Sequence, residues 1–334
     1  MPDKIRWGII STANIGRRAL VPALHSASNG ELVAVASRDL AKARAFADEL
    51  NIPRAYGSYE ELLADPEIDA IYNPLPNDQH ANWSIHAAAA GKHVLCEKPL
   101  ASDAAEAEEM LKAFKAHDRR LAEAFMYRFH PRTRHVREMV LNGAVGALQQ
   151  IGSAFTFRLR SDENIRLEGK LAGGSIMDIG CYAVGVMRFV TGEEPVAVNA
   201  FAHYNERGAD EMATGTLVFP SGVLGHFDCG MRAQGSQWVD IRGSEGRILV
   251  EDAFVAPRDQ SMKIRYWHGD DYEEIAFEPV DQYQLMAEDF ADAILNNRPP
   301  LYPAEDGVAA MRLMDSLRAS AQANRDVMPA QPTA

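Results

Sequence analysis

The first third of the chain alternates short apolar runs with segments whose apolar residues recur every three to four positions. Runs of the first kind predict buried strands, and the second pattern predicts amphipathic helices. The predicted strands are residues 5–10, 32–36, 70–72, 93–96 and 121–125. The predicted helices are residues 15–24, 40–50, 58–63, 79–90 and 104–117. Such alternation is typical of a parallel sheet with right-handed crossovers, so residues 1–125 are predicted to form an α/β, Rossmann-like domain.

After residue 125 the pattern changes to longer strands separated by turns. Strands are predicted over residues 148–159, 195–203, 213–219, 223–229, 238–243, 247–251 and 262–267. Helices are predicted at both ends of this region, over residues 132–141, 283–295 and 305–323. Turn signals such as Pro220-Ser221-Gly222 favour antiparallel pairing. Residues 126–334 are therefore predicted to form an α+β domain with a large, mainly antiparallel open sheet. Its C-terminal helix is expected to pack back on the first domain.

Composition supports two domains and narrows the class of partner. The chain has 334 residues, 47% of them hydrophobic, which suffices for two cores. Its formal net charge of -13 argues against nucleic acids and acidic membranes as partners, because both attract surplus lysine and arginine. Three cysteines, Cys96, Cys181 and Cys229, lie mostly in apolar runs, which indicates reduced core thiols. No export signal or membrane-spanning run is recognised, so a soluble cytoplasmic protein is expected.

The charged end of one predicted strand is the first candidate for chemistry. The apolar run from Gly91 to Cys96 ends on Glu97, Lys98 and Pro99. In open α/β sheets ligands bind beyond the carboxyl ends of the strands, which places Lys98 near a ligand. The alternative is a surface lysine paired with Glu97. Because proline follows the lysine, the Lys98–Pro99 peptide bond is a candidate for the cis form.

The turn after the first strand is a degraded form of the G-x-G-x-x-G dinucleotide motif. Ser11 and Ala13 stand where the first two glycines are usual, and Gly16 keeps the third place, where a bare backbone allows close helix packing. The motif requires backbone N–H groups to approach a pyrophosphate at a helix N-terminus. Ser11, Ala13, Asn14 and Ile15 are therefore candidate cofactor residues, and a plain strand-to-helix turn is the alternative.

The end of the second strand bears on which nicotinamide cofactor is bound. An NAD site offers an acidic side chain there, whereas the 2′-phosphate of NADP favours arginine and hydroxyl donors. Ser37 and Arg38 fit NADP, and Lys42 adds positive charge one helical turn later. NAD stays possible. The alternative is a solvated Arg38 next to an Asp39 that caps the following helix.

Four motifs follow one another along essentially the whole chain. They are residues 13–16 (ANIG), 74–80 (PLPNDQH), 91–100 (GKHVLCEKPL) and 173–182 (GGSIMDIGCY). With these motifs the chain resembles the glucose-fructose oxidoreductase, inositol dehydrogenase and rhizopine-catabolism (Gfo/Idh/MocA) family of sugar and polyol oxidoreductases. The resemblance implies a catalytic lysine beside the nicotinamide and a homodimer or homotetramer formed through the second-domain sheet. It also implies that the loop from Pro74 to His80 passes the cofactor, which makes Pro74, Leu75, Asn77 and His80 candidate cofactor residues beside Glu97 and Lys98. Arg166, just before the glycine pair, is a candidate contact of the nicotinamide or of a substrate hydroxyl, and an exposed loop is the alternative.

Asp178 and Tyr182 are the catalytic candidates besides Lys98. They are four residues apart, so both lie on one face if Asp178 opens a helix, and Gly173 and Gly174 leave room in front of them. Oxidising a sugar hydroxyl needs a proton acceptor and reducing a carbonyl needs a donor, and tyrosine serves as either. A lysine ammonium nearby would favour the phenolate of a group whose ordinary pKa is near ~10. Asp178 would orient sugar hydroxyls, and a core aromatic role for Tyr182 is the alternative.

Two further sets of residues are less specific. Tyr127 and Arg128 follow the last strand of the first domain and are candidate substrate contacts, with packing an equal explanation. His93 and Cys96 have a ligand-like gap but point to opposite faces of a strand, so no metal site is expected.

The sequence therefore predicts an NADP-dependent oxidoreductase that transfers a hydride between nicotinamide and a sugar, keto-sugar or related polyhydroxy compound. One alternative is a dihydrodiol or nucleotide-linked keto-sugar oxidoreductase of the same fold, the latter with a basic patch in the second domain. The other is a non-enzymatic, nucleotide-sensing regulator. The presence of Lys98, Asp178 and Tyr182 argues against the regulator.

Overall fold

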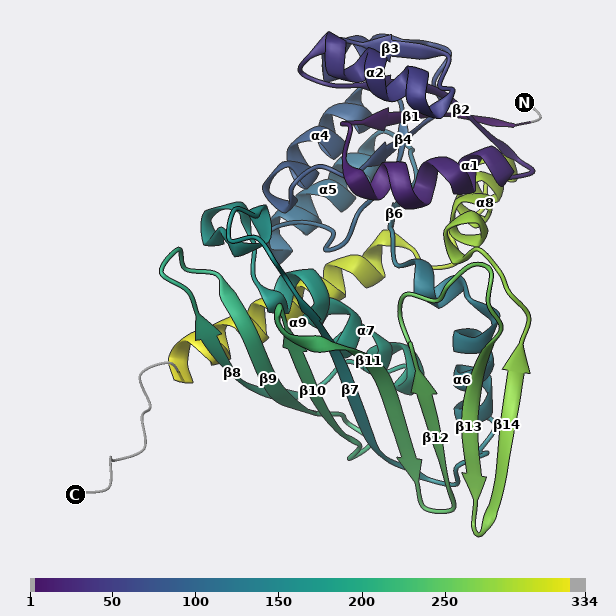
Figure 1. Ribbon diagram of the computed structural model, residues 1–334, viewed down its shortest axis with the longest axis vertical. Helices are drawn as coiled ribbons and strands as arrows, with labels where there is room; N and C mark the ends of the chain where they lie inside the picture. Colours follow the sequence, from purple (N-terminus) through teal and green to yellow (C-terminus); the bar gives the residue numbers. More distant parts are fainter. Residues whose placement is uncertain (1–3, 325–334) are drawn as a thin grey trace. The chain divides into compact units, whose positions relative to one another are not determined.

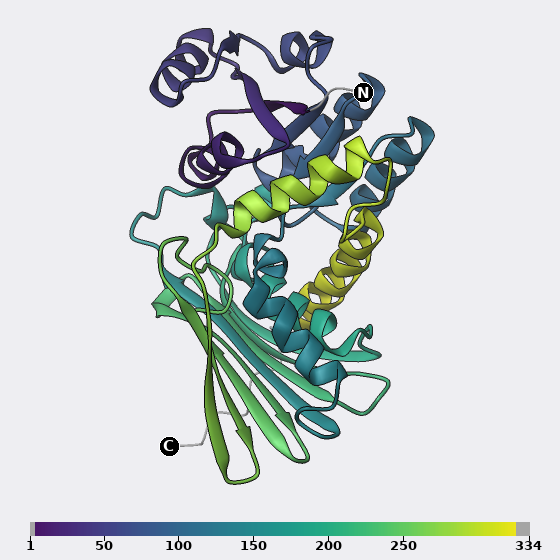
Figure 2. The ribbon, with the colours of Figure 1, turned by 90° about the vertical axis from the view of Figure 1, so that its right-hand side faces the viewer.

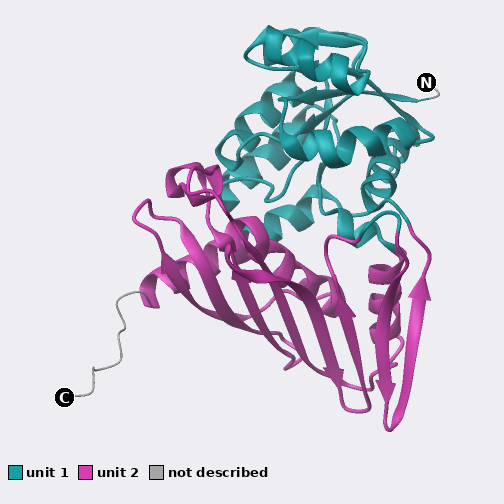
Figure 3. Cartoon of the chain, in the orientation of Figure 1, with its two compact units in different colours: residues 1–130, 257–259, 280–311 teal, residues 131–256, 260–279, 312–334 magenta. Residues whose placement is uncertain are grey.

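The computed structural model describes residues 4–324, which fall into two compact units (Figure 3). Of these residues, unit 1 contains 4–130, 257–259 and 280–311, and unit 2 contains 131–256, 260–279 and 312–324. Helix α9 (Ala304–Ala323) contributes its first residues to unit 1 and the rest to unit 2. The predicted boundary after residue 125 lies near the end of the first stretch of unit 1.

Unit 1 is built on a six-stranded parallel sheet with the order β3-β2-β1-β4-β5-β6 (Figure 1). The strands are β1 (Ile5–Ile10), β2 (Gly30–Ala36), β3 (Arg54–Tyr56), β4 (Ala70–Asn73), β5 (His93–Cys96) and β6 (Leu121–Glu123). The helices are η1 (Gly16–Leu20), α1 (Val21–Ser26), α2 (Leu40–Leu50), α3 (Tyr59–Ala64), α4 (Asn77–Ala89), α5 (Ala104–Ala116), η2 (Met126–Phe129) and α8 (Gln282–Leu295). This arrangement confirms the predicted Rossmann-like fold.

Helix α8 joins unit 1 although it lies far along the chain. Its Phe290 ring packs against Trp7 of β1, with the ring centroids 5.7 Å apart, and both side chains are fully buried. The Glu288 carboxylate of α8 accepts a hydrogen bond of 2.9 Å from the Ser28 backbone N–H. Apolar packing and a polar contact at its edge thus hold α8 on this unit.

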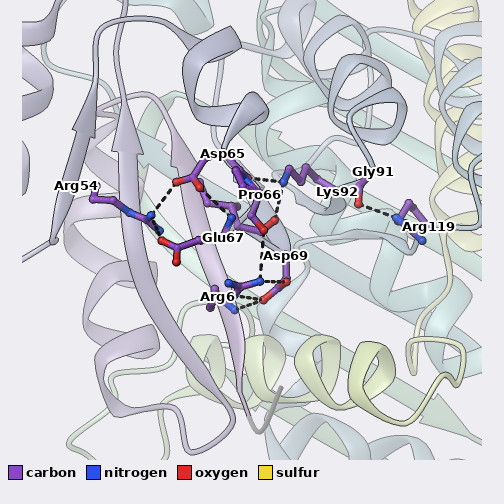
Figure 4. A network of polar contacts seen from close by, with 10 residues as sticks. Arg6, Arg54, Asp65, Pro66, Glu67, Asp69, Gly91, Lys92 and Arg119 are labelled. Carbon is purple, nitrogen blue, oxygen red and sulfur yellow. Dashed lines mark hydrogen bonds and ion pairs between the residues drawn. The ribbon is translucent and has the colours of Figure 1, made fainter. Parts of the chain in front are cut away.

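Polar contacts connect the residues at the amino-terminal ends of strands β1, β4 and β5 in the parallel sheet (Figure 4). Arg6, on β1, donates two side-chain hydrogen bonds of 2.8 and 2.9 Å to the Asp69 carboxylate, just before β4. The Lys92 ammonium, just before β5, donates to the backbone carbonyls of Asp65 and Ile68 at 2.6 and 2.8 Å. Burial lowers the pKa of Lys92. Lys92 therefore has a structural role at the end of the sheet opposite to Lys98.

Unit 2 is built on an eight-stranded sheet with the order β14-β13-β12-β11-β7-β10-β9-β8. Neighbouring strands pair antiparallel except for the parallel pair β7 and β10, which confirms the mainly antiparallel sheet. The strands are β7 (Leu148–Arg158), β8 (Ala197–Tyr204), β9 (Asp210–Val218), β10 (Leu224–Gly230), β11 (Arg232–Gly243), β12 (Gly246–Glu251), β13 (Met262–His268) and β14 (Asp271–Phe277). The helices, besides the end of α9, are α6 (Pro131–Leu141), η3 (Ile165–Leu167), η4 (Gly169–Leu171), η5 (Ile176–Gly180) and α7 (Cys181–Thr191).

The two faces of this sheet differ. Helices α6 and α7 pack on one face (Figures 1 and 2). Along β9 buried and exposed residues alternate, as expected for a strand with one covered face. The other face, which we call the open face, carries large apolar side chains that are 37 to 52% exposed, namely Phe201, Met212, Val218 and Leu224.

Two edge strands are absent from the sequence prediction. β3 has only three residues, too few for a pattern, and the sequence of β14 is rich in acidic and exposed residues. The predicted single helix over residues 15–24 is instead a π-helical segment, η1, followed by α1. None of these differences changes the fold class. Within residues 4–324, no helix has the length and apolarity needed to cross a membrane.

Candidate active site

The turn after β1 has the backbone of a dinucleotide loop although serine replaces its first glycine. Ser11 has φ of 93°, a conformation that favours glycine, and its N–H donates to the Ala36 carbonyl at 2.9 Å. Its hydroxyl accepts a hydrogen bond from the Ala13 N–H at 3.3 Å. Because η1 begins at Gly16, the N–H groups of residues 13 to 15 lie at a helix N-terminus, where an anion is stabilised. This geometry fits a pyrophosphate.

Close packing of the helix does not account for Gly16, so the prediction from the sequence is wrong on this point. A Cβ atom added at this residue would meet only the Tyr72 ring, at 3.9 Å, which is an ordinary contact. The close approach in this region is at Gly8 of β1, where a Cβ would lie 3.2 Å from side chains of Leu62, Ile68 and Ile71. The packing around the backbone is therefore tighter at the glycine of the strand than at the glycine of the turn.

After β2, the acidic residue Asp39 and the basic residues Arg38 and Lys42 have different surroundings. The Asp39 side chain caps α2 by accepting hydrogen bonds from the N–H groups of Ala41 and Lys42, at 2.9 and 3.2 Å. The capping role predicted for Asp39 is thus confirmed. Arg38 and Lys42 are exposed, whereas Ser37 is buried. Burial raises the pKa of Tyr59, on α3, and the charge of Arg38 opposes that shift.

The end of β5 gives Glu97 and Lys98 different surroundings. Glu97 is 9% exposed and accepts a hydrogen bond of 2.5 Å from the Tyr72 hydroxyl. Its other carboxylate oxygen accepts from the Lys98 backbone N–H at 3.3 Å. The Lys98–Pro99 peptide bond is cis, as the sequence suggested. Glu97 is thereby held in the protein, while the Lys98 side chain is half-buried.

The loop from Pro74 to His80 is tied to this strand end by a histidine. His80 is fully buried, and its Nδ1 and Nε2 atoms lie 2.8 Å from the carbonyl oxygens of Pro99 and Leu75. Burial lowers the pKa of His80, and the charge of Lys98 lowers it further. The imidazole therefore links the start of the 74–80 loop to the backbone that follows β5. Asn77, the first residue of α4, is half-buried.

In unit 2 the glycine motif places Asp178 and Tyr182 on one continuous helical segment. Asp178 lies in η5, which begins at Ile176 rather than at Asp178, and Tyr182 lies in the first turn of α7. Tyr182 is 5% exposed and packs edge-on against the ring of Phe155, with the centroids 5.4 Å apart. A π-helical segment is uncommon in proteins and occurs often at functional sites.

Arg166 and Asp178 form a contact that the sequence did not predict. The Arg166 Nε atom donates to an Asp178 carboxylate oxygen at 2.8 Å, and the two side chains are 43 and 13% exposed. The Gly174 N–H donates to the Arg166 carbonyl at 2.8 Å, which fixes the 166 loop to the glycine pair. Nothing in the sequence spacing signals this pair. Arg166 stays a predicted cofactor residue, and its established contact is Asp178.

Tyr127 and Arg128 are engaged inside unit 1. Arg128 is 3% exposed, forms a salt bridge with Asp306 of α9, and lies over the rings of Phe125 and Tyr302 at 5.1 and 5.5 Å. Tyr127 is fully buried. Packing therefore accounts for both residues, and a substrate contact stays a prediction.

The three cysteines are buried and none is in a disulfide. Among residues 4–324, no group of three or more His, Cys, Asp and Glu side chains is arranged to hold a metal ion. Lys98 belongs to unit 1, and Asp178 and Tyr182 belong to unit 2.

Known protein families match both parts of the chain. Residues 5–125 match the model described as "Oxidoreductase family, NAD-binding Rossmann fold", and residues 133–249 match "GFO/IDH/MocA C-terminal domain". The protein belongs to the Gfo/Idh/MocA family. This confirms the family that the four motifs indicated.

Characterised relatives of this Gfo/Idh/MocA protein are dehydrogenases and reductases. D-xylose 1-dehydrogenase (NADP(+)) 2 of Haloferax volcanii is 38% identical over 95% of this chain and 97% of the relative. The dTDP-3,4-didehydro-2,6-dideoxy-alpha-D-glucose 3-reductase of Actinomadura kijaniata is 31% identical, with 96% of each covered. The crystal structure of a 3-ketoreductase from Actinomadura kijaniata with NADP and TDP-benzene has a TM-score of 0.90 and 30% identity, covering 95% of this chain and 98% of that one.

These matches establish the enzyme class. The Gfo/Idh/MocA protein is an oxidoreductase that acts on CH–OH groups, and unit 1 is its NAD(P)-binding Rossmann domain. Both statements confirm predictions made from the sequence.

Proposed function

We propose that the protein is an NADP-dependent dehydrogenase or reductase of a sugar, keto-sugar or related polyhydroxy compound. The observation that carries the proposal is the likeness to an NADP-dependent D-xylose dehydrogenase over 95% of the chain. An aldose is therefore the first substrate to test. The regulator alternative is set aside, because the relatives named above are enzymes.

The preference for NADP is supported by the residues at the end of β2. A site selective for NAD offers a carboxylate to the ribose 2′-hydroxyl, whereas one oxygen of the Asp39 carboxylate, Oδ1, already caps α2 by accepting two backbone hydrogen bonds. Ser37, Arg38 and Lys42 offer a hydroxyl and two cations for a 2′-phosphate. The residues present thus fit NADP better than NAD.

The chemistry divides between the cofactor and three side chains. NADP, when bound, accepts or supplies the hydride at its nicotinamide ring. In the oxidative direction Tyr182 accepts the proton of the substrate hydroxyl while the carbon loses its hydride. The Lys98 ammonium stabilises the phenolate form that Tyr182 needs before it can accept this proton, and the Asp178 carboxylate accepts hydrogen bonds from neighbouring hydroxyls. In the reductive direction Tyr182 returns the proton to the carbonyl oxygen.

A keto-sugar reductase is the second candidate, because the Actinomadura 3-ketoreductase has nearly the same fold. A nucleotide-linked substrate would need cations that are available to bind its phosphates. Three of the arginines around the 162–168 loop pair with carboxylates of unit 2, within 3.2 Å in each case: Arg166 with Asp178, Arg207 with Glu168, and Arg232 with Glu211. This pairing favours an uncharged sugar over a nucleotide-sugar.

The proposal is tested by assaying aldoses, keto-sugars, inositols and a dihydrodiol with NADP and NAD. We expect the highest kcat/KM with an aldose and NADP. Fluorescence titration should show that Arg38→Ala weakens NADPH binding at least tenfold and leaves NADH binding unchanged. Arg44→Ala, which removes an exposed arginine of the same helix, is the control. Equal affinity of the wild-type protein for NADH and NADPH would contradict the cofactor assignment.

The assembly proposed with this function is a homodimer or homotetramer formed through the open face of the unit 2 sheet. Its support is the row of exposed Phe201, Met212, Val218 and Leu224 side chains, which water would otherwise surround.

A further inference from the structure

A buried carboxylate of β9 caps the helical segment that carries Asp178 and Tyr182. Asp210 is 5% exposed, and its Oδ2 atom accepts hydrogen bonds from the Ser175 hydroxyl and the Ile176 N–H, both at 2.7 Å. Ile176 is the first residue of η5, and the side chain of the preceding Ser175 does not cap that helix. Asp210 thus satisfies a donor that the first turn of a helix leaves without an intrahelical partner.

The glycine pair is shaped around this carboxylate. Gly174 has φ of 119°, and a Cβ atom there would lie 2.1 Å from the second carboxylate oxygen of Asp210. Both the backbone conformation and the space therefore require glycine at this position. The Gly174 carbonyl in turn accepts a hydrogen bond of 2.9 Å from the Asp178 N–H. Asp210 consequently contacts the turn that orients Asp178.

Several groups determine the charge of Asp210. Burial raises the pKa of Asp210 to about 6, while the hydrogen bonds from Ser175 and Ile176 and the charge of Arg318 on α9 oppose that shift. From β10, the Cys229 thiol donates to the Ser175 hydroxyl at 3.5 Å. The neighbouring Glu211 is paired with Arg232 at 2.6 Å. A carboxylate at a helix N-terminus is stabilised by the helix dipole, and protonation removes that interaction.

We propose that Asp210 is a positioning residue for catalysis, whose ionised carboxylate holds the first turn of η5 so that Asp178 and Tyr182 face the substrate. The inference rests on the catalytic roles proposed above for those two residues. Displacement of a catalytic group by about 1 Å can cost about 100-fold in rate, so a cap two residues before Asp178 is close enough to matter.

The kinetic test uses Asp210→Asn, which keeps the size of the side chain and removes its charge. We expect kcat to fall at least tenfold, while the preference for NADP over NAD stays within twofold of the wild-type ratio, because Ser37, Arg38 and Lys42, the residues proposed to set that preference, lie in unit 1. In the wild-type enzyme kcat should fall as the pH drops through about 6, and this fall should be absent in the variant. Glu211→Gln changes the next carboxylate of the same strand and should leave kcat within twofold.

Hydrogen exchange of the cofactor-free protein gives a readout that needs no substrate. The amides of residues 176–182 should lose protection in Asp210→Asn, with the central strands of unit 2 unchanged. Wild-type kcat and pH profile in Asp210→Asn would overturn the proposal, as would wild-type protection of residues 176–182. Equal loss of activity in Glu211→Gln would also overturn it, because the effect would then be a general one. If no sugar is turned over, the proposed function fails while the exchange experiment still decides whether Asp210 orders this segment.

Discussion

At the scale of single residues, the two charged residues at the end of β5, Glu97 and Lys98, have different surroundings. The Glu97 carboxylate accepts hydrogen bonds from the Tyr72 hydroxyl and the Lys98 backbone, which explains why an acidic residue is buried there. Lys98 follows it with a half-buried side chain. A surface ion pair between neighbours, the alternative considered for this sequence, is therefore not needed to explain Glu97. The role proposed for Lys98 is in the reaction.

The serine at the first glycine position of the cofactor loop is strained. Because Ser11 has φ of 93°, Ser11→Gly should raise the free energy of unfolding by about 1 kcal/mol and leave NADPH affinity unchanged or higher. Thermal unfolding and fluorescence titration measure the two effects. Asn51→Gly is the matched control, since Asn51 also has a positive φ, of 55°, but asparagine tolerates that conformation. A lower unfolding midpoint for Ser11→Gly would show that its side chain matters more than its backbone.

At the scale of elements, the sequence pattern correctly predicted the features that depend on neighbouring residues in the chain, such as buried strands and helix caps. The buried strands of both sheets follow apolar runs, and the capping role of Asp39 follows from its position before a helix. The edge strands β3 and β14 were missed because their pairing depends on a neighbouring strand rather than on their own residues.

Contacts between residues far apart in the sequence could not be predicted either, because they depend on the tertiary structure rather than on the local pattern. Asp210 meets Ser175 across 35 positions of sequence, and Arg128 meets Asp306 across 178. Arg128 appeared as a candidate substrate residue because its position after a strand was known and its partner was not. The sequence thus identified the motifs of the family, but not the side chains that hold those motifs in place.

His93, the first residue of β5, makes the free energy of unfolding depend on pH. Burial, with smaller effects from Arg119 and Arg120, lowers the pKa of His93 to about 4, and its Nδ1 atom accepts the Arg120 N–H at 2.8 Å. Between about pH 4 and 6.5 the unfolded chain binds a proton that the folded protein does not, so stability rises with pH in this window. The contribution of His93 is up to about 3 kcal/mol above pH 6.5 and is lost as the pH falls toward 4.

His93→Gln should flatten this part of the stability curve, because glutamine does not titrate and can still accept the Arg120 hydrogen bond. Denaturant unfolding at pH 4.5, 5.5 and 7 measures the slope. Exposed His117→Gln serves as the control. An unchanged slope for His93→Gln would mean that the pKa of His93 is the same in the folded and the unfolded protein, and would contradict this account.

At the scale of the whole molecule, the open face of the unit 2 sheet is the proposed assembly surface. A charge placed on that face should separate the subunits, because a buried unpaired carboxylate is costly. Leu224→Asp and Phe201→Asp are therefore expected to give monomers in light scattering, whereas the wild-type protein gives a dimer or tetramer. Leu141→Asp, at an equally exposed leucine on α6, should leave the mass unchanged. A monomeric wild-type protein would contradict the proposed assembly.

The central claim is that Lys98 and Tyr182 handle the proton during hydride transfer to or from NADP. Its most direct test is the single-turnover rate of NADP reduction with the best aldose, measured for the wild-type enzyme, Tyr182→Phe and Lys98→Met. The account predicts a loss of at least ~100-fold in Tyr182→Phe and a comparable loss in Lys98→Met, with NADPH affinity of Tyr182→Phe unchanged. A rate within tenfold of the wild-type value in Tyr182→Phe would contradict it and leave Tyr182 as a packing residue of the unit 2 core.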